Sequence, residues 1–166
     1  MFLWFVGSAV LAVWYVFRDD HFDYRLLVVG ALLPELDALF ALDDGPGMRW
    51  MHSVAFSVAL LVMVMTVTAG RRPVRRLLLG LPIGTFLHLV FDGAWATTDV
   101  FWWPFGGWGL DDESLPAVQR GWWNVPLELA GLAVVVWVWR RQGLAEPARR
   151  DDVMRTGRLF ATPSSR

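Results

Sequence analysis

The sequence predicts an all-α integral membrane protein, a bundle of about five transmembrane helices, and three observations support this fold class. Hydrophobic residues make up 55% of the 166 residues, and charged residues only 19%. The charges gather in short segments, and the long apolar runs between them are typical of membrane spans joined by loops. The 11 tryptophans suit a membrane interface, where an indole is half apolar and half hydrated.

Each predicted helix is an apolar run bounded by charged or turn-forming residues. The run 1–17 is followed, not preceded, by a positive charge, so we interpret it as an uncleaved span and not as a signal peptide. The run 26–42 contains Glu35 and Asp37, and a re-entrant segment buried among the other helices is the alternative for it. The remaining runs are 53–70, 77–98 and 122–139.

The distribution of arginine predicts the orientation and the domain organisation. Four arginines lie in 71–76 and seven in the segment from Arg140 onward, and positive segments stay in the cytoplasm. We therefore predict an N-terminus outside and a C-terminus inside. All 15 basic residues are arginine, which suggests GC-rich codons and a bacterial source. Residues 1–142 are predicted to form the transmembrane domain and 143–166 a disordered, Arg-rich cytoplasmic tail.

Polar side chains within the apolar runs converge on the external side of this predicted topology. Glu35 and Asp37 lie toward the outer end of the second run, His52 lies immediately before the third, and His88 and Asp92 lie in the outer half of the fourth. Ionisable groups in a membrane are costly and usually face a protein interior or a wet cavity. The chain has no cysteine, so a thiolate metal site and a cysteine nucleophile are excluded.

The residue types in this group are those of a divalent metal site. His88 and Asp92 are spaced i, i+4 and share one helical face, and two imidazoles with carboxylates suit Zn²⁺ or Mn²⁺. A histidine that only bonds a neighbouring helix is the alternative for each position alone. Residues expected to support the site without binding the metal are Arg49, Ser53, Asp99 and Glu128; for Glu128 the alternative is a structural pair with an arginine.

Four short stretches resemble a known family in the same order along the chain: Gly30-Ala-Leu-Leu-Pro-Glu-Leu-Asp37, Arg49-Trp-Met-His-Ser53, Leu87-His-Leu-Val-Phe-Asp92 and Phe101-Trp-Trp-Pro-Phe105. They are similar to motifs of the small LexA-regulated, inner-membrane-associated metal-dependent hydrolases. The resemblance covers Gly30 to Phe105. It implies metal or catalytic roles for Asp37, His52, His88 and Asp92, with Glu35 at the first acidic position.

The chain departs from that family's pattern within the first two motifs, where Arg49 is displaced by one position and Met51 replaces a threonine. Glu35 replaces the usual aspartate, and Gly47 and Met48 stand where the second motif has its first histidine. Loss of that histidine would remove a ligand, convert a two-metal site to a one-metal site, or mark a chain that is no longer an enzyme.

The leading functional hypothesis is a metal-dependent hydrolase of a lipid or lipid-linked ester or phosphoester at the external leaflet. Glu35 or Asp37 would take the proton from a metal-bound water. A non-catalytic scaffold or partner subunit is one alternative, and a proton-relay or transport subunit is another. Membrane lipids are the expected partners and nucleic acid is not, while the sequence leaves the oligomeric state open.

Overall fold

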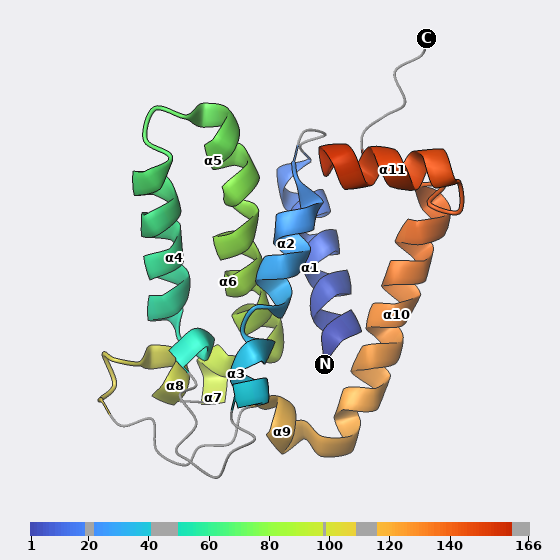
Figure 1. Ribbon diagram of the computed structural model, residues 1–166. Coiled ribbons are helices and arrows are strands. Elements are labelled where there is room, and N and C mark those ends of the chain that lie inside the picture. The colour runs from blue at the N-terminus through green and yellow to red at the C-terminus, as the bar shows by residue number, and fades with distance from the viewer. Residues whose placement is uncertain (19–21, 41–49, 98, 109–115, 161–166) are drawn as a thin grey trace.

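The computed structural model describes residues 1–18, 22–40, 50–97, 99–108 and 116–160, and their regular structure consists of helices without a strand (Figure 1). This confirms the all-α prediction. The elements in chain order are α1 (Phe2–Phe17), α2 (Tyr24–Leu32), α3 (Glu35–Phe40), the 3-10 helix η1 (Trp50–His52), α4 (Val54–Val67), α5 (Arg72–Leu78), α6 (Gly80–Asp92), α7 (Ala94–Thr97), α8 (Asp99–Trp102), α9 (Pro116–Arg120), η2 (Gly121–Trp123), α10 (Asn124–Arg141) and α11 (Pro147–Thr156).

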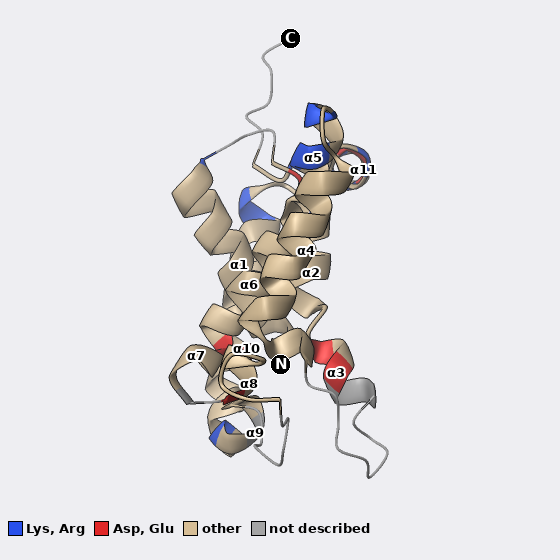
Figure 2. Cartoon of the chain, turned by 90° about the vertical axis from the view of Figure 1, so that its left-hand side faces the viewer, with Lys and Arg blue, Asp and Glu red and all other residues tan. Residues whose placement is uncertain are grey.

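The apolar segments run back and forth between two ends of a bundle (Figure 1). We call the end that holds the N-terminus, α3, α7, α8 and α9 the N-terminal end, and the end that holds α5 and α11 the α11 end. Figure 2 shows arginines of α5 at the α11 end and the acidic residues of α3 at the N-terminal end. Glu35 and Asp37 of the second apolar segment therefore lie at the same end as η1 and the last turn of α6, as the sequence predicted.

Two helices of the described residues are long and apolar enough to cross a membrane, Arg72–Asp92 and Gly121–Arg141. The sequence analysis predicted about five spans, and these two helices support only part of that prediction. α1 and α4 are apolar but shorter, with 16 and 14 residues, where about 20 are needed to span. The second apolar run is divided into α2 and α3 by a turn at Leu33 and Pro34, because a proline has no N–H to continue a helical ladder.

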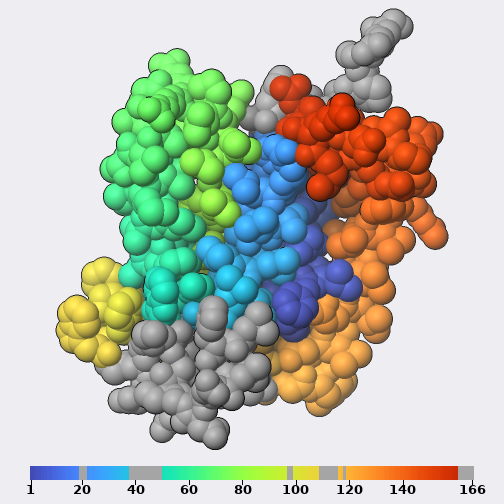
Figure 3. All heavy atoms as spheres, in the orientation of Figure 1, coloured from blue at the N-terminus to red at the C-terminus, as the bar shows by residue number. Residues whose placement is uncertain are grey.

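The outward faces of the bundle are nevertheless apolar. α4 and α10 form its two outer edges in the view of Figure 3. On α4, Val62 and Val67 expose 55% and 65% of their surface, and on α10 Val125 and Leu129 each expose 60%. A contiguous apolar surface of this kind marks contact with a membrane or another apolar partner.

Close packing between α2 and α6 depends on glycine. A Cβ atom on Gly30 would lie 2.2 Å from the carbonyl oxygen of Leu81, and one on Gly84 would lie 2.3 Å from that of Leu27. The Thr85 hydroxyl donates to the Gly30 carbonyl at 3.2 Å across the same interface. Small residues let helix backbones approach closely in membrane bundles. This approach brings the C-terminal turn of α2 against the part of α6 that carries His88.

The segment after residue 142 differs from the disordered tail that the sequence predicted. α11 lies across one end of the bundle, and the backbone N–H of Tyr24 donates to the Gly157 carbonyl at 2.9 Å (Figure 1). Leu159 is buried against residues of α1 and α2, and the Phe160 ring stacks on Trp14 with ring centroids 5.0 Å apart. A few apolar side chains thus dock a segment whose composition is mostly polar. Residues 161–166 lie outside the described residues.

Candidate metal centre

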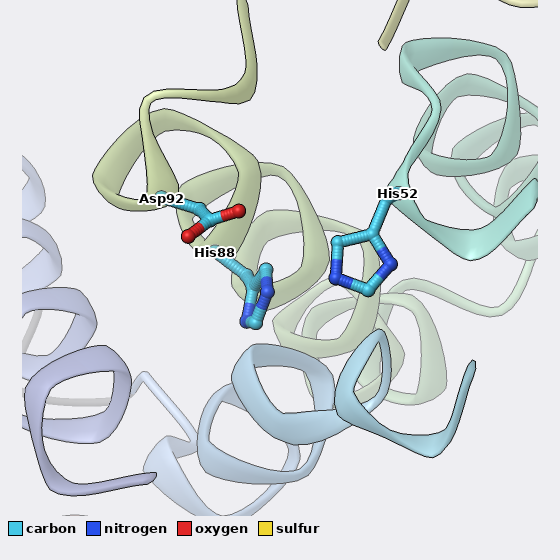
Figure 4. A group of neighbouring side chains, drawn as sticks. All are labelled: His52, His88 and Asp92. Carbon is cyan, nitrogen blue, oxygen red and sulfur yellow. The ribbon is translucent and has the colours of Figure 1, made fainter. Parts of the chain in front are cut away.

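Three of the four predicted metal ligands come together at the N-terminal end of the bundle. One ligand atom from each of His52, His88 and Asp92 lies within 4.8 Å of the other two. All three side chains are buried, with at most 3% of each residue exposed. Figure 4 shows the His52 ring directed toward His88, and Asp92 one turn farther along α6. A buried group of this composition could hold a metal ion.

The orientation of His88 is set by α2. Its Nδ1 lies 2.7 Å from the carbonyl oxygen of Ala31. Because a carbonyl only accepts, Nδ1 carries the proton and Nε2 keeps its lone pair. The Phe5 ring covers one face of the imidazole, with ring centroids 3.8 Å apart. His88 is therefore held in the tautomer that presents Nε2 as a ligand.

His52 is oriented in a similar way by Asp37. The Nδ1 atom of His52 lies 3.3 Å from Asp37 Oδ2, and the same oxygen accepts a hydrogen bond from the Met51 backbone N–H at 2.8 Å. A carboxylate on one ring nitrogen fixes the tautomer and leaves the other nitrogen for a metal. The rings of His52 and His88 meet nearly edge to face, with centroids 5.3 Å apart.

The two carboxylate oxygens of Asp92 have different surroundings. Arg120 donates from Nη2 to Asp92 Oδ1 at 2.6 Å and from Nη1 to the Asp92 backbone carbonyl at 2.5 Å. The other oxygen, Oδ2, is buried and has no hydrogen-bond partner among the described residues. Buried polar atoms are nearly always partnered, so a lone buried carboxylate oxygen fits a position that a cation can take.

Two imidazole nitrogens and one carboxylate oxygen form a donor set that suits Zn²⁺, Mn²⁺ or a similar divalent ion. Three protein ligands would leave further coordination positions for water or substrate, as catalytic metal sites require. The residues present therefore fit the predicted cofactor, a divalent metal ion.

Asp37 and Glu35 are placed differently from their predicted roles. Asp37 is not in the converging group but lies behind His52, where it orients the imidazole. Glu35 Oε1 accepts a hydrogen bond from the amino group of Met1 at 3.1 Å. The position of Glu35 thus gives no support to a role as general base. Because Glu35 and Asp37 are two residues apart on a helix, they point in different directions, and only Asp37 reaches the histidines.

The four residues that the sequence predicted to support the site differ in where they lie and what they contact. Ser53 is buried and caps α4, accepting from the Phe56 N–H at 3.1 Å, which fixes the helix start beside His52. Glu128 Oε2 accepts from the Leu3 N–H at 2.9 Å and so joins α10 to α1. Asp99 is exposed on α8, unlike the buried ligands. Arg49 lies outside the described residues, and its predicted role stays a prediction.

Comparisons with known proteins do not identify a relative: no family model, curated protein or solved structure matches this chain. The resemblance to the membrane-associated hydrolases therefore stays a prediction. The candidate metal centre rests on its own geometry.

Two contributors to this geometry were not predicted from the sequence. The Ala31 carbonyl belongs to the backbone and has no signal in the sequence. Arg120 did have one, because it and Arg49 are the two arginines of segments 43–52 and 99–121, which the predicted topology places outside and in which the other charged residues are acidic. A lone cation beside a predicted cluster of carboxylates marks a candidate ion-pair partner.

Proposed function

We propose that this protein is a membrane-embedded metal-dependent hydrolase in which His52, His88 and Asp92 bind one divalent cation. The observation that supports this most strongly is the buried convergence of three ligand atoms within 4.8 Å. A bound divalent cation would generate a nucleophilic water at neutral pH and polarise an ester or phosphoester. The chain's own groups orient the ligands: the Ala31 carbonyl holds His88, and Asp37 holds His52.

A lipid or lipid-linked ester or phosphoester is the proposed substrate. The candidate metal centre lies at the end of an apolar bundle, at the same end as η2 (Figure 1). Trp122 and Trp123 of η2 expose 69% and 58% of their surface, as interfacial tryptophans do. A site at the level of a membrane interface meets the ester and phosphoester groups of lipids, whose polar and apolar parts join at that depth.

Hydrolysis should be measured on the full chain purified in detergent, without any ion gradient. We expect the protein to release product from lipid esters or phosphoesters. This activity should stop when a chelator removes the metal and return when a divalent metal ion is added back. Activity without a gradient would separate this function from transport. A protein that binds stoichiometric metal but cleaves no lipid ester or phosphoester would favour the scaffold alternative, which the missing motif histidine also suggests.

We also propose that the five apolar segments all cross a bacterial inner membrane, with the N-terminus outside and the C-terminus in the cytoplasm. Their alternation between the two ends supports this, as do the arginines of α5 at the α11 end (Figure 2). Reporter fusions at residue 74 and after α11 should report the cytoplasm, and a fusion at Gly106 should report the exterior. A reversed pattern would move the metal centre to the cytoplasmic face.

A further inference from the structure

We infer that Arg120 is a positioning residue of the candidate metal centre, which holds the Asp92 carboxylate so that only Oδ2 is presented to the cation. The inference rests on the proposed metal binding by His52, His88 and Asp92. Arg120 would not touch the metal. It would act through Asp92, and it lies on α9, 28 residues along the chain from Asp92.

Arg120 contacts Asp92 at two points, the carboxylate oxygen Oδ1 at 2.6 Å and the backbone carbonyl at 2.5 Å. Asp92 is the last residue of α6, and the last carbonyls of a helix have no partner within the helix. Arg120 supplies that partner. Because one rigid guanidinium contacts both the backbone and the side chain of Asp92, it fixes the direction of the carboxylate relative to the helix end.

Arg120 is itself held in place by the start of α10. Its Nε lies 3.3 Å from Asn124 Oδ1, and Asn124 Nδ2 donates to the Ala117 carbonyl at 2.6 Å. The Arg120 side chain is 24% exposed, whereas that of Asp92 is 1% exposed. The Arg120 side chain therefore extends from the partly exposed surface, where Asn124 holds it, to the buried carboxylate of Asp92.

The pairing geometry differs from that of an arginine whose only task is to neutralise a carboxylate. Arginine commonly binds both oxygens of a carboxylate in parallel, as a fork. Here the second Nη goes to the backbone carbonyl, and Oδ2 is left buried and unpartnered among the described residues. Figure 4 shows one carboxylate oxygen of Asp92 directed toward the side where the imidazoles lie. This arrangement prepares Asp92 to bind a cation through a single oxygen.

Two effects of Arg120 on metal binding oppose each other. Its positive charge repels a divalent cation, whereas its hydrogen bonds hold the ligand in the orientation that binding needs. We expect orientation to dominate, because hydrogen-bonding partners of metal ligands typically contribute roughly 10–100-fold to metal affinity. Whether the loss of Arg120 weakens or strengthens metal binding is therefore a direct test of its positioning role.

The experiment compares the Zn²⁺ affinity of the full chain in detergent, by competition with a chelator, for the wild type, Arg120→Met, Arg120→Lys and the control Arg149→Met. Arg149 makes the same kind of contacts at the other end of the bundle, to Asp152 Oδ2 at 2.5 Å and the Leu159 carbonyl at 2.8 Å. We expect Arg120→Met to weaken binding about 10–100-fold, Arg120→Lys to recover part of the loss, and Arg149→Met to match the wild type.

The visible spectrum of the Co²⁺-loaded protein gives a second readout, which a merely structural role would not change. We expect the ligand-field bands to shift in Arg120→Met and to stay unchanged in Arg149→Met. Equal or tighter Zn²⁺ binding by Arg120→Met with an unshifted spectrum would overturn the role of Arg120 and leave the metal centre standing. A wild type that binds no metal would overturn the proposed function as well.

If Arg120→Met does not fold, Arg120→Lys and Asn124→Ala take its place. Asn124→Ala removes the contact that aims the guanidinium but leaves Arg120 itself intact. Both variants should bind Zn²⁺ more weakly than the wild type, by a smaller factor than the full deletion of the guanidinium. Wild-type affinity in both would overturn the inference.

Discussion

Replacing His88 with alanine should abolish stoichiometric binding of a divalent metal. The variant removes one of three converging ligands, which should weaken binding by more than the roughly 100-fold that loss of an outer hydrogen-bonding partner can cost. The free energy of unfolding should fall by less, because among the described residues the imidazole makes a single hydrogen bond, to the Ala31 carbonyl, and packs on the Phe5 ring. Elemental analysis of the purified wild type and variant, together with their unfolding temperatures, measures both effects.

The matched control for this variant is Thr85→Val. Thr85 lies one turn from His88 on α6 and also donates to a backbone carbonyl of α2, that of Gly30. It has no ligand atom in the candidate metal centre. We expect Thr85→Val to lose some stability and keep its metal. Equal loss of metal in both variants would assign the effect to the α2–α6 packing, and full metal content in His88→Ala would refute the metal centre.

Replacing Gly84 with alanine should strongly destabilise the protein. A Cβ atom at this position would lie 2.3 Å from the Leu27 carbonyl oxygen and 2.7 Å from the Ala31 backbone nitrogen. These contacts are with backbone, which cannot turn aside as a side chain can. Overpacking typically costs about 1–3 kcal/mol, and we expect the upper end of that range. That is a large part of a usual stability of roughly 5–15 kcal/mol.

The same substitution should also weaken metal binding. Separation of α2 from α6 would move the Ala31 carbonyl away from His88 and release the imidazole from its fixed tautomer. Gly106→Ala is the control, because a Cβ atom there would meet its nearest neighbour, the Trp102 Cβ, at 3.7 Å. We expect it to change stability by less than about 0.5 kcal/mol. An unchanged unfolding temperature for Gly84→Ala in detergent would contradict the close α2–α6 approach.

Residues 143–160 adopt a regular, docked structure although their composition predicted disorder. Composition averages over a window, and this window is rich in arginine and acidic residues. Its docking depends on a few positions, with Leu159 buried and Phe160 stacked on Trp14 of α1. Such contacts join residues more than a hundred positions apart, so no local average contains them.

The sequence by itself determined the features that depend on local geometry. The long apolar runs predicted helices, and the i, i+4 spacing predicted that His88 and Asp92 share a face, because an α-helix repeats every 3.6 residues. Alternation of the runs then predicted that His52, His88 and Asp92 lie at one end, and the structure brings all three together.

Only the tertiary structure decided how that end is assembled. It assigned Asp37 to His52 and Glu35 to the Met1 amino group, and it brought Arg120 to Asp92. These choices depend on how closely α2 approaches α6 and on where α9 returns to the bundle. Such distances follow from the packing of backbones at Gly30 and Gly84 and from long-range hydrogen bonds, none of which has a period along the chain.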